Sequence, residues 1–185
     1  MTSTSRVSPR PAPLAASGEL DVARLFDLHA EFVWRVLKRL GTPLLELEDA
    51  LQEVFLVVSR KLPEYEERGE LRAWLFTIAR QVAIHARRAD QRRTRRERQQ
   101  DPPVAALDPH SAFERSEAQR FVEHFLAQLD EDQATVFFLA EVEGMTAPEI
   151  ASCVGASLNT VYSRLRLARE RFERALQRQR ERSSR

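Results

Sequence analysis

The sequence predicts an all-α fold of two small helical domains joined by a flexible linker. Through most of the chain, apolar residues recur three and four residues apart, which is the period of one helix face. Only five glycines occur, and β-branched residues rarely alternate with polar ones, which argues against sheets. The stretch 99–112 has three prolines and no apolar stripe, so it separates the two helical parts.

The same patterns set the expected limits of each part. The N-terminal residues are rich in Ser, Pro and Ala and are predicted to be disordered. The predicted segments are a tail at 1–18, a first domain at 19–96, a linker at 97–115, a second domain at 116–178 and a basic tail at 179–185.

The first domain is predicted to contain three helices. An apolar stripe runs from Val22 to Leu40 and stops at Gly41, a second helix spans about 46–62 and stops before Pro63, and a third begins near Glu70. The third helix places these apolar residues inward: Leu71, Trp74, Leu75, Ile78 and Val82. Beyond them it becomes an arginine-rich segment without an apolar stripe.

The second domain is predicted to begin with two helices, near 121–129 and 133–143. The second of them is expected to turn these residues inward: Val136, Leu139, Ala140 and Val142. The segment 144–172 follows directly and carries the most informative pattern of the chain.

This segment, GMTAPEIASCVGASLNTVYSRLRLARERF, has the signals of a helix-turn-helix. Thr146 and Glu149 have the spacing of a capping box, Gly155 supplies the turn, and Ser157 is suited to cap the second helix. One face of that helix is apolar: Val161, Leu165, Ala168 and Phe172. A polar face is left outward: Asn159, Thr160, Tyr162, Ser163 and Arg166. This face indicates a helix that enters the major groove of DNA. The alternative interpretation is an ordinary helical hairpin with a solvated face.

The formal net charge of +1 conceals a strong segregation of charge along the chain. Residues 87–98 hold seven arginines and two acids, and residues 164–185 hold nine arginines and three acids. By contrast, residues 130–149 hold six acids and no base, and residues 46–70 are also acidic. Such segregation favours separate faces for separate partners, with the basic ones matching phosphate; solvated faces or tails are the alternative.

The sequence offers no catalytic constellation, metal site or cofactor site. The four histidines are scattered without metal-ligand spacing, and we expect His29 to be a hydrogen-bonded core residue and Cys153 a small core residue. No apolar run reaches membrane-spanning length and no signal-peptide core is visible, so we expect a cytoplasmic protein without direct membrane insertion.

Three segments together resemble a known family. EDALQEVFLVVSRKL is similar to region 2.2 of bacterial sigma factors, and LRAWLFTIARQVAIHARR to regions 2.3 and 2.4. LDEDQATVFFLAEVEGMTAPEIASCVGASLNTVYSRLRLAR is similar to region 4. The chain from about residue 20 to 176 therefore resembles a group IV, or extracytoplasmic-function (ECF), sigma factor, which does no chemistry itself.

The resemblance implies a role for each of three residue sets. Those expected to bind core polymerase are Asp49, Leu51, Gln52, Glu53 and Phe55. Those expected at the −10 element are Phe76, Arg80, Gln81, Ile84, Arg87 and Arg88. Those expected at the −35 element are Asn159, Thr160, Tyr162, Ser163, Arg164 and Arg166. The implied partners are core RNA polymerase through its β′ clamp and β flap, promoter DNA, and an anti-sigma factor, which in relatives is often membrane-bound.

The chain departs from the common family pattern at four positions. Gln81 stands where Asn is usual, and His85 where Asp or Asn often occurs. Asn159 stands where many relatives have Gly, and Tyr162 where they have Lys or Arg. The first pair affects the −10 specificity, and the second lowers the positive charge of the recognition helix. Residues 66–71 match the loop that frames a base pocket in relatives.

Two other classes of protein account for part of the sequence. A stand-alone helix-turn-helix regulator explains residues 113–178 but leaves the QEVF and WLFTIAR segments unexplained. A helical adaptor that binds only protein treats both basic ends as solvated tails.

Overall fold

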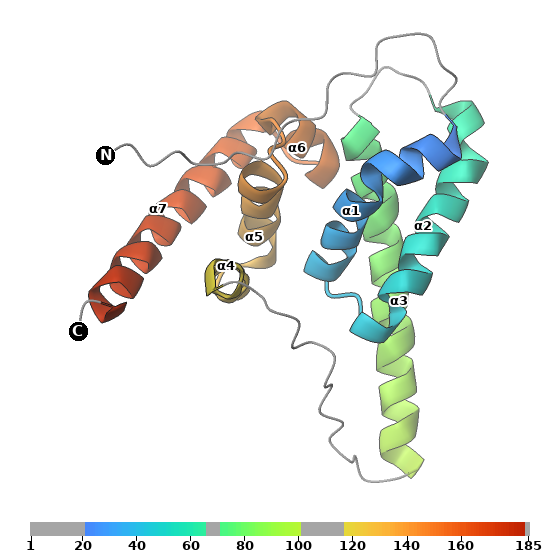
Figure 1. The fold of residues 1–185 in the computed structure, drawn as a ribbon, viewed down its shortest axis with the longest axis horizontal. Coiled ribbons are helices and arrows are strands. Elements are labelled where there is room, and N and C mark those ends of the chain that lie inside the picture. Colours follow the sequence, from blue (N-terminus) through green and yellow to red (C-terminus); the bar gives the residue numbers. More distant parts are fainter. Residues whose placement is uncertain (1–20, 66–70, 101–116, 184–185) are drawn as a thin grey trace. The chain divides into compact units, whose positions relative to one another are not determined.

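The computed structural model describes residues 21–65, 71–100 and 117–183, and every regular element in these ranges is helical (Figure 1). The expected all-α fold is confirmed. The helices form two units, one containing α1 to α3 and the other α4 to α7. The predicted N-terminal tail, most of the predicted linker, and most of the loop expected at 66–71 lie outside the described residues.

The first unit is a bundle of three main helices with two short 3₁₀ turns. Its elements are α1 (Val22–Arg39), η1 (Leu44–Glu46), α2 (Leu47–Lys61), η2 (Leu62–Glu64) and α3 (Leu71–Gln100). Asp21 caps α1, because its side chain accepts a hydrogen bond from the backbone N–H of Ala23. After α1 the chain turns at Gly41, whose φ of +77° lies in the left-handed region that glycine adopts without strain.

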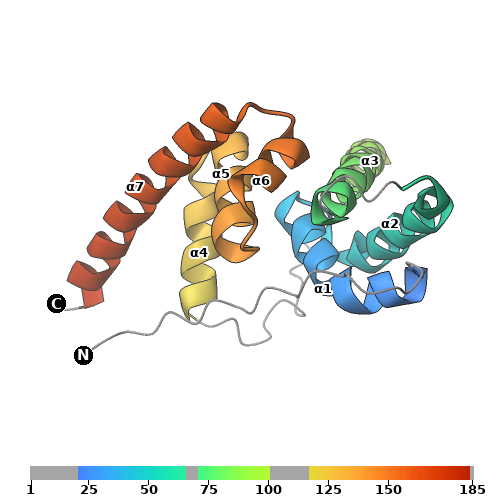
Figure 2. The ribbon, with the colours of Figure 1, turned by 90° about the horizontal axis from the view of Figure 1, so that it is seen from above.

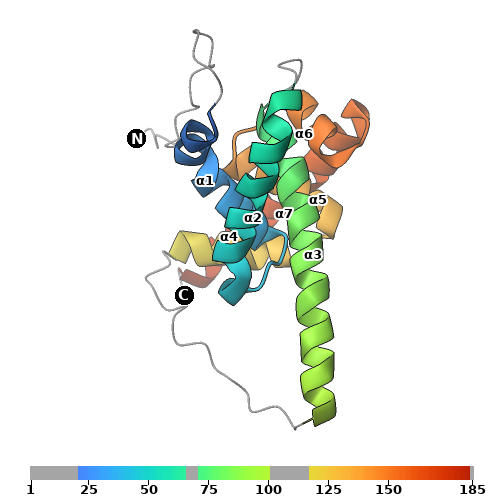
Figure 3. The same ribbon diagram turned by 90° about the vertical axis from the view of Figure 1, so that its right-hand side faces the viewer.

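The core of this unit lies where all three helices meet, side by side in Figures 1 and 3. Its fully buried apolar side chains are Leu25, Val33, Val36 and Leu37 from α1, Leu47, Val54 and Val58 from α2, and Leu75, Phe76 and Ala79 from α3. The apolar stripes predicted for the three helices therefore meet in one core. Trp74 is half-buried, with its ring 4.6 Å from that of Tyr65.

His29 is buried in this core, as expected, but its Nε2 atom has no hydrogen-bond partner among the described residues. The expectation of a hydrogen-bonded histidine is wrong for that atom. Burial lowers the pKa of His29, and the charge of Arg72 lowers it further. The imidazole is thus neutral at neutral pH, which is compatible with its apolar surroundings. The Arg72 guanidinium itself lies 4.3 Å from the centre of the Phe32 ring.

Helix α3 is longer than the sequence predicts. It runs to Gln100, so the first four residues of the expected linker are helical. Figure 3 shows its C-terminal half extending well beyond α1 and α2. An ion pair between Glu46 and Arg93, at 2.9 Å, joins this half to the start of α2. The arginine-rich turns are therefore presented on a regular helix.

The second unit is built around the long helix α7 (Figure 2). Its elements are α4 (Glu117–Ala127), α5 (Glu131–Phe137), the π-helical turn η4 (Phe138–Val142), α6 (Ala147–Val154) and α7 (Leu158–Ser183). Four phenylalanines, from α4, α5 and α7, form its aromatic core: Phe121, Phe125, Phe137 and Phe172. Phe172 contacts the other three, with ring centres 5.0–5.8 Å apart.

The helix-turn-helix predicted from the sequence is α6, the turn and α7. Thr146 and Glu149 form the capping box at the start of α6. Gly155 ends α6 with a φ of +66°, and the Ser157 hydroxyl accepts a hydrogen bond from the backbone N–H of Thr160. These local expectations are confirmed. Cys153 is buried, which agrees with its expected core role.

The structure differs from the sequence pattern of this unit at one residue and extends its last helix. Val142 was expected to face inward with Val136 and Leu139, but it is 40% exposed. The chain changes from α-helix to a π-helical turn after Phe137, and the wider turn rotates Val142 out of the apolar stripe. In addition, α7 continues to Ser183, so the predicted C-terminal tail is helical up to that residue.

Candidate protein and nucleic-acid interfaces

The residues expected to bind polymerase divide into exposed and buried groups. Asp49, Gln52 and Glu53 are exposed on α2, and Leu51 is half-buried. Phe55 is only 6% exposed, and its ring packs edge-on against Phe26 at 4.8 Å. Unlike the other residues of this set, Phe55 therefore belongs to the contact between α1 and α2 in this structure.

Two exposed leucines extend this surface, and sequence reasoning missed both. Leu45 in η1 is 88% exposed and Leu56 on α2 is 57% exposed. With Asp49 and Gln52 they occur at intervals of four, three and four residues, the repeat of one helix side. We call these four residues, together with the neighbouring exposed Glu53, the α2 face. The sequence signal that could have identified these leucines is an apolar residue at each end of a polar helix stripe.

Three of the residues expected at the −10 element share one side of α3. Gln81, Ile84 and Arg88 lie three and four residues apart; Gln81 and Arg88 are exposed, and Ile84 is half-buried. Arg80 is exposed as well. The amide of Gln81 can form a hydrogen bond with a base edge. Ile84 offers an apolar contact for a base or sugar, and the guanidinium of Arg88 can contact a phosphate.

Two other residues of this set are engaged inside the unit. Phe76 is 2% exposed and lies in the core, so in this structure its ring contacts other core residues and is not presented at the surface. The arginine at 87 donates a hydrogen bond from Nη1 to the carbonyl oxygen of Leu40, at 3.1 Å. Arg87 thereby joins α3 to the end of α1, although the residue is exposed.

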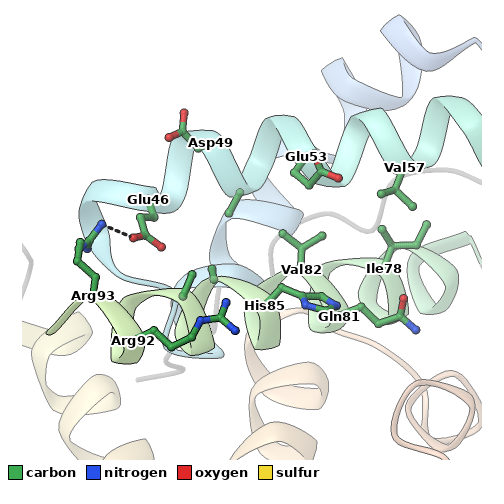
Figure 4. Close-up of a pocket in the computed structure, with 13 residues that line it drawn as sticks. Glu46, Asp49, Glu53, Val57, Ile78, Gln81, Val82, His85, Arg92 and Arg93 are labelled. Carbon is green, nitrogen blue, oxygen red and sulfur yellow. Dashed lines mark ion pairs between the residues drawn. The ribbon is translucent and has the colours of Figure 1, made fainter. Parts of the chain in front are cut away.

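A groove of about 820 Å³ separates α2 from the adjoining part of α3 (Figure 4). Glu46 from η1 and Asp49 and Glu53 from α2 line one side. Gln81, His85 and Arg92 are among the residues that line it from α3. Figure 4 shows the Asp49 carboxylate at the rim, pointing away from α3. The groove thus brings the expected polymerase-binding and −10 residues to opposite sides of one depression, which linear motifs did not predict.

The polar face predicted for the recognition helix is present on α7. Asn159, Ser163 and Arg166 are exposed at intervals of four and three residues, opposite the buried side formed by Val161 and Leu165. Tyr162 is 54% exposed beside them. We call Asn159, Tyr162, Ser163 and Arg166 the α7 reading face.

The remaining two residues expected at the −35 element are held by their own domain. Thr160 is half-buried, and its hydroxyl lies 2.8 Å from that of Ser157. Arg164 forms an ion pair with Asp132, in the first turn of α5. Arg164 therefore lies on the side of α7 that contacts α5, whereas Arg166 belongs to the outward side.

Within the described residues, no three potential metal-ligating side chains come together. No helix in the same ranges is long and apolar enough to cross a bilayer.

Comparison with known proteins identifies the family. Residues 25–93 match Sigma-70 region 2, and residues 122–172 match Sigma-70 region 4. The chain is 32% identical over 169 residues to the ECF RNA polymerase sigma factor SigL of Mycobacterium tuberculosis, and the alignment covers 83% of this chain and 88% of that relative. The chain belongs to the ECF sigma factors of RNA polymerase, which direct promoter-specific initiation.

Solved structures have the same fold. RpoE of Bartonella quintana, crystallised with the anti-sigma factor NepR, has a TM-score of 0.64 and 23% identity, covering 84% of this chain and 96% of that chain. CnrH, solved with the cytosolic domain of CnrY, has a TM-score of 0.60 and 22% identity, covering 84% of this chain and 87% of that chain. The match to region 2 contradicts the alternative of a stand-alone helix-turn-helix regulator, because a protein of that class does not contain this domain.

Proposed function

We propose that the two units of this sigma factor divide promoter recognition between them. The α1–α3 unit binds core polymerase and opens the −10 element, and the α4–α7 unit reads the −35 element. The observation that carries this division is the placement of two polar, exposed helix faces, on α3 and α7, within the two sigma regions. Each face is opposite a buried apolar side, so each is available for a ligand.

The α2 face is the proposed docking surface for the β′ clamp of the polymerase. Its carboxylate and amide side chains supply polar contacts, and Leu45 and Leu56 supply apolar contacts at the two ends. Protein interfaces combine apolar contacts with polar ones in this way. By the same family relation, the α4–α7 unit is proposed to contact the β flap.

On the DNA side, Gln81, Ile84 and Arg88 are the proposed −10 contacts, with Arg80 beside them. The exposed guanidinium of Arg88 suits phosphate, and the amide of Gln81 suits a base edge. Gln81 lines the same groove as Asp49 and Glu53, which supports DNA binding next to the polymerase-binding helix. Polymerase docking and strand opening are therefore proposed to occur on adjoining surfaces of one rigid bundle.

Replacing Arg166 by Ala tests the −35 assignment. The experiment uses a promoter that the wild-type holoenzyme has selected from a pool of random DNA sequences. Transcription from this promoter should fall roughly 5- to 150-fold, because a bidentate base contact contributes about 1–3 kcal/mol. It should fall much less at a promoter whose −35 element has been scrambled. Run-off transcription at both promoters measures the difference.

Arg164→Ala is the matched control for that experiment. Arg164 is paired with Asp132 on the flank of α7, so its loss should produce a smaller decrease that is similar at both promoters. If Arg164→Ala abolishes discrimination between the promoters and Arg166→Ala does not, the reading face has been assigned to the wrong side of α7.

We further propose that an anti-sigma factor regulates this protein. The support is the occurrence of NepR and CnrY as partners in the two solved structures of the same fold. The α2 face is the proposed point of competition, since an inhibitor that covers it excludes polymerase. In this proposal the protein acts in the cytoplasm, and any attachment to the membrane is supplied by a membrane-bound partner.

A further inference from the structure

The arginines around the recognition helix are paired with carboxylates of their own domain. Arg164 pairs with Asp132 of α5, and Arg169 pairs with Glu141 of η4 at 2.7 Å. On α7 itself, Arg166 pairs with Glu170, also at 2.7 Å. Three arginines thus have three acidic partners, which come from three different elements.

These pairs are located at the surface, so their value to folding is small. Both partners of the Arg166–Glu170 and Arg169–Glu141 pairs are exposed, and Asp132 is exposed beside a half-buried Arg164. Ion pairs in such positions contribute about 0–1 kcal/mol to stability, and often nothing measurable. Their concentration around one helix therefore points to an effect on the ligand of that helix.

The effect follows from how an arginine binds DNA. Attraction to phosphate depends on net positive charge and is the same for every sequence, whereas base readout depends on directed hydrogen bonds. A carboxylate beside a guanidinium cancels most of the net charge but occupies only part of its five N–H donors. In the Arg166–Glu170 pair, Nη1 of Arg166 donates to Oε1 of Glu170, which leaves other donors of the guanidinium for a base edge.

We propose that Asp132, Glu141 and Glu170 are specificity determinants of this sigma factor, carboxylates that suppress sequence-independent phosphate binding by the arginines of α7. The inference rests on the proposed −35 role of α7 and deepens it. The free α4–α7 unit has low affinity for random DNA, and base contacts add affinity only at the correct element. Binding to polymerase holds the α4–α7 unit near the promoter, and the resulting high local concentration compensates for its low affinity.

The test replaces the three acids by their amides in the full chain: Asp132→Asn, Glu141→Gln and Glu170→Gln, singly and together. Binding of the reconstituted holoenzyme to a duplex with the selected −35 element and to a scrambled duplex is measured between 50 and 200 mM salt. The triple variant should bind the scrambled duplex more tightly. Each newly contacted phosphate should steepen the slope of log K against log salt by about 0.9, or by about 2.7 for three. The ratio of selected to scrambled binding should fall.

Glu173→Gln is the matched control, because Glu173 is an exposed acid on the same helix that makes no ion pair with the described residues. It changes the net charge equally and should leave the binding ratio unchanged. The inference is overturned if the triple variant keeps the wild-type ratio, or if Glu173→Gln lowers the ratio as much as Glu170→Gln. A wild-type protein that binds both duplexes equally contradicts the −35 role itself and removes the inference with it.

Discussion

Replacing Phe76 by Ala should destabilise the α1–α3 unit by about 3–5 kcal/mol, the usual cost of removing a buried phenylalanine ring. Phe76 is one of the largest fully buried side chains of that unit. Because small domains are stable by only about 5–15 kcal/mol, the loss is a large part of the total. Both tryptophans, Trp34 and Trp74, lie in this unit, so tryptophan fluorescence during denaturant unfolding reports on it selectively.

Gln81→Ala is the control for Phe76→Ala. Gln81 is exposed on the same helix, so its replacement should change the unfolding free energy by less than about 0.5 kcal/mol. It should still reduce opening of the −10 element, measured by the reactivity of unpaired thymines in the promoter complex. A Phe76→Ala protein with the wild-type unfolding midpoint and a specific loss of strand opening would show that Phe76 acts on DNA, as the sequence had indicated.

Reversing charge on α2, with Asp49→Lys and Glu53→Lys together, should weaken binding to core polymerase by roughly 100-fold or more. Like charges brought together at an interface cost several kcal/mol, and each tenfold change in affinity corresponds to about 1.4 kcal/mol. Both carboxylates are exposed, and among the described residues only the Glu53–Arg60 contact, at 3.3 Å, is lost. The helix content, measured by circular dichroism, should therefore remain that of the wild type.

Each single substitution on α2 can be compared with Asp27→Lys. Asp27 is an exposed acid of α1 in the same unit, and it lies outside the α2 face. Its reversal should leave the affinity for core polymerase within about threefold, which is the range of small surface effects. Unchanged affinity of the double variant, with intact helices, would place the docking surface elsewhere. Loss of helix content would show that Asp49 and Glu53 are structural.

The helices and the helix-turn-helix could be predicted because their signals are local. A capping box, a left-handed glycine and a three-four apolar repeat each act within a few residues, so Thr146, Glu149 and Gly155 adopt the roles that their spacing predicts. The ends of helices were less predictable. The arginine-rich part of α3 has no apolar stripe, yet it remains helical to Gln100, because arginine and glutamine favour the helix once it has started.

The surfaces were harder to predict than the helices. A repeat indicates which side of a helix is apolar, but neighbouring helices determine which residues at its edges are covered. Phe55 and Phe76 were expected at interfaces and are buried by α1 and by the shared core, whereas Val142 is turned outward by a π-helical turn. The pairing of Arg164 with Asp132 joins residues 32 positions apart, a contact that no local pattern in the sequence encodes.

Promoter-dependent run-off transcription is the most direct test of the central claim, that this chain gives core polymerase its promoter choice. Core RNA polymerase, the full chain and a template carrying the selected promoter are combined, and the transcripts are resolved by length. We expect one transcript from a defined start site, made only when the chain is present and lost when the −10 element is scrambled. A chain that fails to bind core polymerase and gives no such transcript, while binding the duplex by itself, would contradict the account.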